Sequence, residues 1–139
     1  MVHRKEAYLK KARLLIAGVG ILLPYLARIP GVLFEGPEWF TSFLGSGPGA
    51  LVFFGFFNAF CWASILLATS TYRHPDSAWF PVVFGFSMPA VAYSFLDLAS
   101  SSTAAVALAF IPLFSLPLVF AGWLAGRYYD RKQTALEAE

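Results

Sequence analysis

The amino-acid sequence predicts an all-α membrane protein with four transmembrane helices, a short interfacial helix in the first outer loop and both termini in the cytoplasm. Of the 139 residues, 58% are hydrophobic and only 13% are charged, against about 45–50% and about 25% in ordinary soluble domains. Apolar segments recur along the chain, and its basic residues fall almost entirely on one side of the resulting topology. A chain of this length forms a single domain, here residues 1–139.

The basic residues predict the orientation. Of the 10 Lys and Arg residues, all except Arg28 lie before the first apolar segment, in the second connection or after the last segment. Because basic residues near segment ends resist translocation, the loops that contain them stay cytoplasmic. We therefore expect an integral protein of a bacterial inner membrane, with both termini in the cytoplasm.

The first span is expected at about residues 14–34. Its most apolar part, Leu14 to Ala27, is only about 21 Å long as a helix, shorter than the roughly 30 Å hydrocarbon core. The helix should therefore extend at one or both ends. Pro24 and Pro30 should kink it or end it on the outer side, because proline lacks a backbone N–H.

The long first connection predicts a short helix on the outer leaflet. Gly36, Pro37 and Glu38 form a helix-start pattern, with proline at the first position and an acid in the first turn. The apolar residues that follow share one helical face, as in interfacial helices. They are Trp39, Phe40, Phe43 and Leu44.

Three further spans are expected at about residues 50–71, 78–98 and 104–126. The second connection, Ser70 to Ser77, should be a cytoplasmic turn. The third connection, Ala99 to Ser102, is so short that the last two spans should form an antiparallel hairpin. Tyr and Trp residues cluster where these spans should meet the membrane surfaces, which agrees with the same topology.

The sequence predicts no catalytic, cofactor-binding or metal-binding residues. General acid–base catalysis needs positioned titratable groups, and both histidines, His3 and His74, are expected outside the membrane. His74 and Asp76 around Pro75 offer metal ligands, but a site needs three or four converging groups, so a polar turn is favoured. The lone Cys61 has no second sulfur for redox or thiolate-metal chemistry. An enzyme is not expected.

Polar residues inside the spans are a second set of candidates, because they are costly in a membrane and often functional. Asn58, Ser87 and Ser115 are expected at similar mid-membrane depths. They either line a small polar layer, as in transporters, or form hydrogen bonds between helices. The second reading is favoured because no ionisable residue lies at the midplane.

The Phe-rich second span offers rings to a quinone, a pigment or an acyl chain. Contact of these rings with lipid and with neighbouring helices is the favoured alternative, so no cofactor is predicted.

Arg28 and Asp97 are expected to form an ion pair at the outer interface. The first and third spans both run outward and end near these residues. A pair offsets part of the cost of each charge near lipid. The alternative roles for Asp97 are to reach the headgroups alone, or to bind a cation or a partner's basic residue.

Gly122 and Gly126 form a small-xxx-small pattern that permits close helix packing. The sequence leaves open whether this packing is internal or between subunits.

Two functions are compatible with these features. The first is a non-catalytic accessory, assembly or stabilising subunit of a larger membrane complex, of which an immunity protein that recognises a toxin's helices is a special case. The alternative is a small homo-oligomeric transporter or channel with a midplane polar layer. The expected partners are membrane lipids and other integral membrane subunits, with homo-oligomers left open. Nucleic acid is not expected, because a large basic face is absent.

Overall fold

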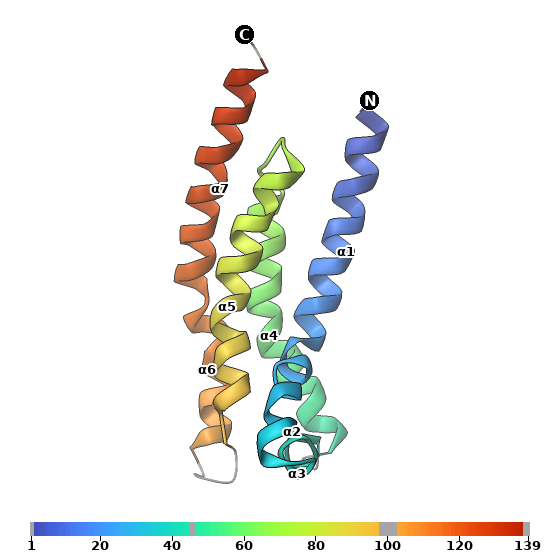
Figure 1. Cartoon of the computed structure of the whole chain (residues 1–139), viewed down its shortest axis with the longest axis vertical. Helices are drawn as coiled ribbons and strands as arrows, with labels where there is room; N and C mark the ends of the chain where they lie inside the picture. The colour runs from blue at the N-terminus through green and yellow to red at the C-terminus, as the bar shows by residue number, and fades with distance from the viewer. Residues whose placement is uncertain (1, 45–46, 98–102, 138–139) are drawn as a thin grey trace.

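The computed structural model describes residues 2–44, 47–97 and 103–137. These residues form seven α-helices and one short 3-10 helix, and no strand occurs among them. The elements, labelled in Figure 1, are α1 (Val2–Leu26), α2 (Ile29–Glu35), α3 (Glu38–Leu44), α4 (Pro48–Thr69), η1 (Pro75–Ala78), α5 (Trp79–Phe95), α6 (Ala104–Phe114) and α7 (Leu116–Leu136).

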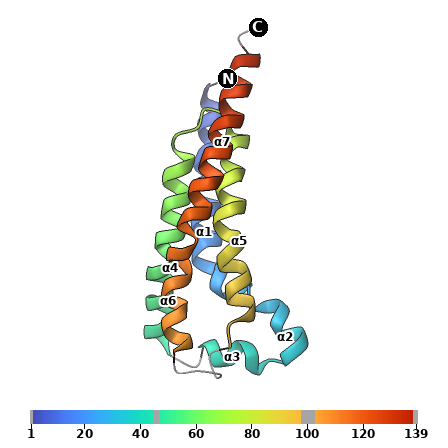
Figure 2. The ribbon, with the colours of Figure 1, turned by 90° about the vertical axis from the view of Figure 1, so that its left-hand side faces the viewer.

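The helices form an elongated bundle. In Figures 1 and 2, α1, α4, α5 and the α6–α7 pair all run along its long axis. The start of α1 and the end of α7 lie at one end, which we call the terminal end. Helices α2 and α3 lie at the opposite end, which we call the loop end. The most extensive packing is between α5 and α7, followed by that between α1 and α4.

Three helical stretches in the described part of the chain are long and apolar enough to cross a membrane. They are Lys10–Glu35, Pro75–Phe95 and Phe110–Leu136. They correspond to the predicted first, third and fourth spans. The predicted second span falls in α4, where Gly55–Thr69 counts as a shorter apolar helix.

The first span is interrupted near Pro24 and Pro30, as the sequence predicted. Helix α1 ends at Leu26, two residues after Pro24, and a separate helix, α2, begins at Ile29. Pro30 lies in the first turn of α2, where its missing N–H leaves no helical hydrogen bond unmade. The two prolines thus end one helix and begin another, and Arg28 lies at the break.

A short helix, α3, is present where the interfacial helix was predicted. It begins at Glu38, directly after Pro37, and the acid lies in its first turn. Gly36 has a positive φ of 83°, a conformation that glycine adopts without steric cost. The side chains of Phe43 and Leu44 lie outside the described residues. Of the predicted apolar face, the structure therefore describes Trp39 and Phe40.

The predicted fourth span is two helices. Helix α6 ends at Phe114 and α7 begins at Leu116, with Ser115 between them. Pro117 in the first turn of α7 cannot donate a backbone hydrogen bond to α6. Helix α7 then continues to Leu136, ten residues beyond the predicted end at residue 126.

The second connection is a turn, as predicted, followed by η1. The third connection, Ala99 to Ser102, lies outside the described residues.

The core lies where α1, α4, α5 and α7 meet. Its buried apolar residues are Ile16, Leu23, Cys61, Ile65, Ala68, Phe86 and Val119. Glycines permit the close approach of these helices. A Cβ at Gly85 would lie 2.6 Å from a Val119 methyl and 2.7 Å from an Ile65 methyl. One at Gly122 would lie 2.7 Å from the Phe80 carbonyl oxygen, so α7 packs directly on the backbone of α5.

Three phenylalanines of α4 lie on the outside of the bundle. Phe53, Phe56 and Phe60 are exposed, and the rings of Phe56 and Phe60 pack edge to face with centroids 6.1 Å apart. Exposed aromatic rings of this kind suit contact with lipid.

Candidate functional site

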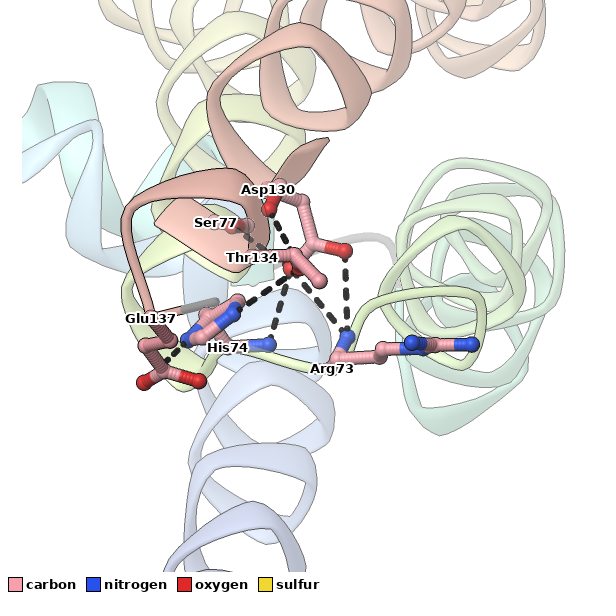
Figure 3. Close-up of polar contacts among 6 residues, drawn as sticks. All are labelled: Arg73, His74, Ser77, Asp130, Thr134 and Glu137. Atoms are coloured by element: carbon pink, nitrogen blue, oxygen red, sulfur yellow. Dashed lines mark hydrogen bonds and ion pairs between the residues drawn. The ribbon is translucent and has the colours of Figure 1, made fainter. Parts of the chain in front are cut away.

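The Asp130 carboxylate at the terminal end accepts several hydrogen bonds from the connection between α4 and α5 (Figure 3). It is 8% exposed. Its Oδ1 atom accepts hydrogen bonds from the His74 backbone N–H at 2.8 Å, the Arg73 N–H at 3.1 Å and the Ser77 hydroxyl at 3.1 Å. Its Oδ2 atom lies 3.3 Å from the Arg73 nitrogen. One side chain of α7 therefore holds the whole connection between α4 and α5.

His74 extends this network along α7. Its Nε2 atom lies 3.2 Å from the Thr134 hydroxyl, which donates to the Asp130 carbonyl at 2.9 Å. Its Nδ1 atom lies 3.8 Å from the Glu137 carboxylate. The favoured interpretation of His74 and Asp76 as part of a polar turn agrees with this geometry. No group of three His, Cys, Asp or Glu side chains in the described chain is arranged to hold a metal ion.

The chemistry of Asp130 follows from its neighbours. The turn before η1 leaves backbone N–H groups without helical acceptors, and buried donors of this kind need a partner. An ionised carboxylate forms stronger hydrogen bonds than a neutral acceptor. Since its bonds go to backbone and Ser77, we assign Asp130 the role of anchoring the connection to α7.

Sequence reasoning missed Asp130. It lies next to Arg131 in a basic stretch after the predicted last span, where charged residues usually face water. The role of Asp130 becomes apparent once α7 is known to continue beyond residue 126. This continuation places Asp130 beside the connection between α4 and α5.

Tyr72 also links the connection between α4 and α5 to α7. Its hydroxyl donates to the Trp123 carbonyl at 3.1 Å. Burial, with a smaller contribution from the Asp130 charge, raises the pKa of Tyr72 to about 12, and the Arg127 charge opposes this shift. The phenol therefore stays protonated and able to donate at neutral pH.

At the loop end, Arg28 is fully buried. Its Nη1 atom donates to the Leu96 carbonyl at 2.9 Å, and its Nε and Nη2 atoms donate to the Trp39 carbonyl at 3.3 and 3.0 Å. The guanidinium also lies over the Trp39 ring, 4.5 Å from its centroid. Arg28 therefore links the end of α1 to α3 and to the end of α5.

The predicted partner of Arg28 is close by. Asp97 follows Leu96 directly, and its charge interacts favourably with the Arg28 guanidinium. Arg28 and Asp97 therefore lie near each other at the loop end. A direct ion pair between their side chains stays a prediction.

The three mid-membrane polar residues do not share one site. The Asn58 side chain is buried and its amide nitrogen donates to the Gly20 carbonyl of α1. Ser115 is buried and donates to the Pro112 carbonyl at 2.6 Å. Ser87 is exposed on α5 and donates to the Phe84 carbonyl of its own helix at 2.7 Å. Asn58 thus joins α4 to α1, and the Ser115 side chain also hydrogen-bonds the Cys61 side chain of α4.

Gly122 and Gly126 serve internal packing in this chain. A Cβ at Gly122 would meet the backbone of Phe80 and Pro81, and one at Gly126 would lie 2.8 Å from the Ser77 carbonyl oxygen. The faces of α7 that carry these glycines are thus already occupied.

Three stretches of the described chain have the length and apolar composition of membrane-spanning helices, which is typical of a helical membrane protein. Comparison of the chain with protein-family models, with curated proteins and with solved structures finds no match.

Replacing Asp130 should loosen the terminal end. Asp130→Ala leaves the N–H groups of Arg73 and His74 without their acceptor, and we expect a loss of at least about 2 kcal/mol of unfolding free energy. Denaturation of the detergent-solubilised protein measures it. Asp76→Asn is the matched control, because Asp76 is an exposed acid in the same turn. Equal effects of both variants would contradict the anchoring role.

A double-mutant cycle tests the Arg28–Asp97 pair. Arg28→Met and Asp97→Asn should be non-additive, with an interaction free energy of about 0.5–3 kcal/mol, because either single change leaves a charge without its partner. The same cycle with Glu35→Gln, an exposed acid at the loop end, should be additive. Additivity in both cycles would mean that each charge reaches water separately.

Proposed function

We propose that the chain crosses the membrane four times, with α4 as the additional span. Helix α4 has 22 residues and is therefore about 33 Å long, enough for a hydrocarbon core of about 30 Å. It runs beside α1 and α5 and packs against both. The start of α1 and the end of α7 lie at the same end of the bundle. An even number of antiparallel spans places both termini on one side, so this arrangement also supports four spans.

The proposed membrane is a bacterial inner membrane, with the terminal end in the cytoplasm. Exposed basic residues gather toward the terminal end, in the first half of α1, in the second connection and near the end of α7. They include Lys10, Lys11, Arg13, Arg73, Arg131 and Lys132. The loop end carries Arg28, and this residue is buried. This asymmetry supports cytoplasmic termini by the positive-inside rule.

We further propose that the protein is a non-catalytic accessory, assembly or stabilising subunit of a larger membrane complex. The observation that carries this proposal is the use of its buried polar side chains. Each one that the structure describes hydrogen-bonds to its own chain. They are Arg28, Asn58, Thr69, Ser77, Ser115 and Asp130. Side chains that hydrogen-bond in this way stabilise the fold, which supports a structural role for them in preference to acid–base chemistry.

The outer surface supports contact with lipid and with other membrane helices. Large apolar side chains are exposed along the bundle, among them Leu33, Val52 and Phe114. Such a surface suits integral membrane partners as well as lipid, and recognition by an immunity-type protein needs no more than this.

One observation favours the alternative of a small homo-oligomeric transporter or channel. The Asn58 Oδ1 atom is buried and has no hydrogen-bond partner among the described residues. Buried unsatisfied oxygens are uncommon, and this one offers an acceptor to a permeating solute.

Cysteine labelling tests the orientation. In a Cys61→Ala background, Ser42→Cys in α3 should react with a membrane-impermeant maleimide added from outside, and Lys132→Cys should react only in opened cells. The opposite pattern would overturn the proposed topology.

Purification in mild detergent tests the proposed function. The chain should co-purify in fixed ratio with unrelated integral membrane subunits, and His74→Ala or Asp76→Ala should leave the function of that complex nearly unchanged. The result against it is a pure homo-oligomer that transports solute in liposomes and loses this activity with Asn58→Leu. A Ser87→Ala variant is the control, because Ser87 bonds only its own helix.

A further inference from the structure

A basic cavity lies at the terminal end, between the second connection and α7. Its volume is about 640 Å³, and its lining includes the side chains of Arg73, Arg127 and Arg131, with Thr71 and Thr134 beside them. Arg127 and Arg131 are one helical turn apart on α7, so they share a face. Arg73 approaches from the connection. We call this space the arginine cavity.

The arginine cavity has an excess of positive charge. Asp130 is its one acidic lining residue, and its carboxylate is directed to the Arg73 and His74 backbone and to Ser77 (Figure 3). In the described part of the chain, none of the three guanidinium groups forms an ion pair with an acid. Planar guanidinium forks that lack acidic partners are well suited to bind phosphate oxygens.

An apolar groove adjoins the arginine cavity. It lies between α4 and α7, has a volume of about 390 Å³, and is lined by residues that include Leu67, Leu116, Phe120 and Trp123. Thr71 lines both spaces. The groove therefore continues directly from the cavity along the bundle toward the centre of the proposed membrane.

The boundary between the two spaces is amphipathic. The Trp123 indole nitrogen donates to the Thr71 hydroxyl at 3.0 Å, and the Arg127 guanidinium lies 5.3 Å from the Trp123 ring centroid. Tryptophan commonly occupies the level of the lipid headgroups. The junction of cavity and groove thus matches the junction of headgroup and acyl chain in a phospholipid.

We propose that this surface binds one anionic glycerophospholipid of the inner leaflet. Its phosphate lies among Arg73, Arg127 and Arg131, and one acyl chain lies in the groove between α4 and α7. Basic pockets between helices on the cytoplasmic side have the chemistry to bind such headgroups. A free phosphate would leave the groove unused, whereas a phospholipid fills both spaces. The proposal rests on the terminal end being cytoplasmic and is independent of any partner subunit.

Tryptophan quenching by lipids with brominated acyl chains tests the proposal. The pure chain is reconstituted in phosphatidylcholine vesicles that contain a minor fraction of brominated phosphatidylglycerol or brominated phosphatidylcholine. Subtraction of the Trp123→Phe signal isolates Trp123. We expect brominated phosphatidylglycerol to quench Trp123 more strongly, and Arg73→Gln or Arg131→Gln to reduce this preference about fivefold each.

Matched controls separate a site from general surface charge. Lys10→Gln and Lys132→Gln remove exposed charges at the same end but outside the cavity lining, so both should keep the preference. Arg131→Lys keeps the charge but loses the planar fork, so it should retain more of the preference than Arg131→Gln. Ser64→Leu places a larger side chain in the groove, which leaves less room for an acyl chain, and it should reduce Trp123 quenching. Added inorganic phosphate should leave the quenching unchanged.

Three outcomes would overturn the proposal. One is equal Trp123 quenching by the two brominated lipids, and a second is an equal loss of preference in the lysine controls. The third is competition by inorganic phosphate with no effect of Ser64→Leu, which would identify a free-anion site. Because the measurement uses the chain alone, failure to find a partner complex leaves it unaffected, and cysteine labelling checks the orientation separately.

Discussion

The structure depends on one constraint, which is that polar groups among lipid-facing helices must find partners inside the chain, because hydrocarbon offers none. The two ends of the bundle meet it in opposite ways. At the loop end the cation Arg28 donates to the carbonyls of Leu96 and Trp39, which follow or begin helices. At the terminal end the anion Asp130 accepts from the N–H groups of Arg73 and His74. Each charge thus binds backbone groups that lie beside a break between helices.

The two anchors also explain why the middle of the bundle can be apolar and tightly packed. With the helix ends held by hydrogen bonds, the centre needs few polar contacts, and Gly85 and Gly122 let neighbouring helices approach closely. Two buried side chains of α4 do form polar contacts there. The Asn58 amide joins α4 to α1 at Gly20, and the Cys61 thiol donates to the Gly85 carbonyl of α5. Close contact of backbones through small residues is a main source of affinity between helices in membranes, where helix association gains little from the hydrophobic effect.

Composition and apolar length were sufficient to predict an all-helical membrane protein, and the Gly36–Pro37–Glu38 pattern located α3 correctly. The prolines were harder to interpret. Pro24 and Pro30 were expected to disturb the first span, but whether a proline kinks a helix or starts a new one depends on its neighbours. For the same reason, the break at Ser115 was not foreseen. The importance of Arg28 was predicted because a lone charge near an apolar segment is conspicuous. Asp130 was not, since its role depends on α7 extending beside a connection more than fifty residues earlier in the chain.

That separation has a consequence for the order in which the chain is made. The contacts of Asp130 span 53 to 57 residues, so the turn at Arg73 and His74 leaves the ribosome well before its acceptor exists. Helices α1 and α4 are already available to each other at that stage, joined by Asn58 and Gly20. The corner between α4 and α5 instead relies on water or headgroups to solvate its N–H groups until the last helix arrives. Completion of the bundle is therefore tied to the synthesis of its final helix.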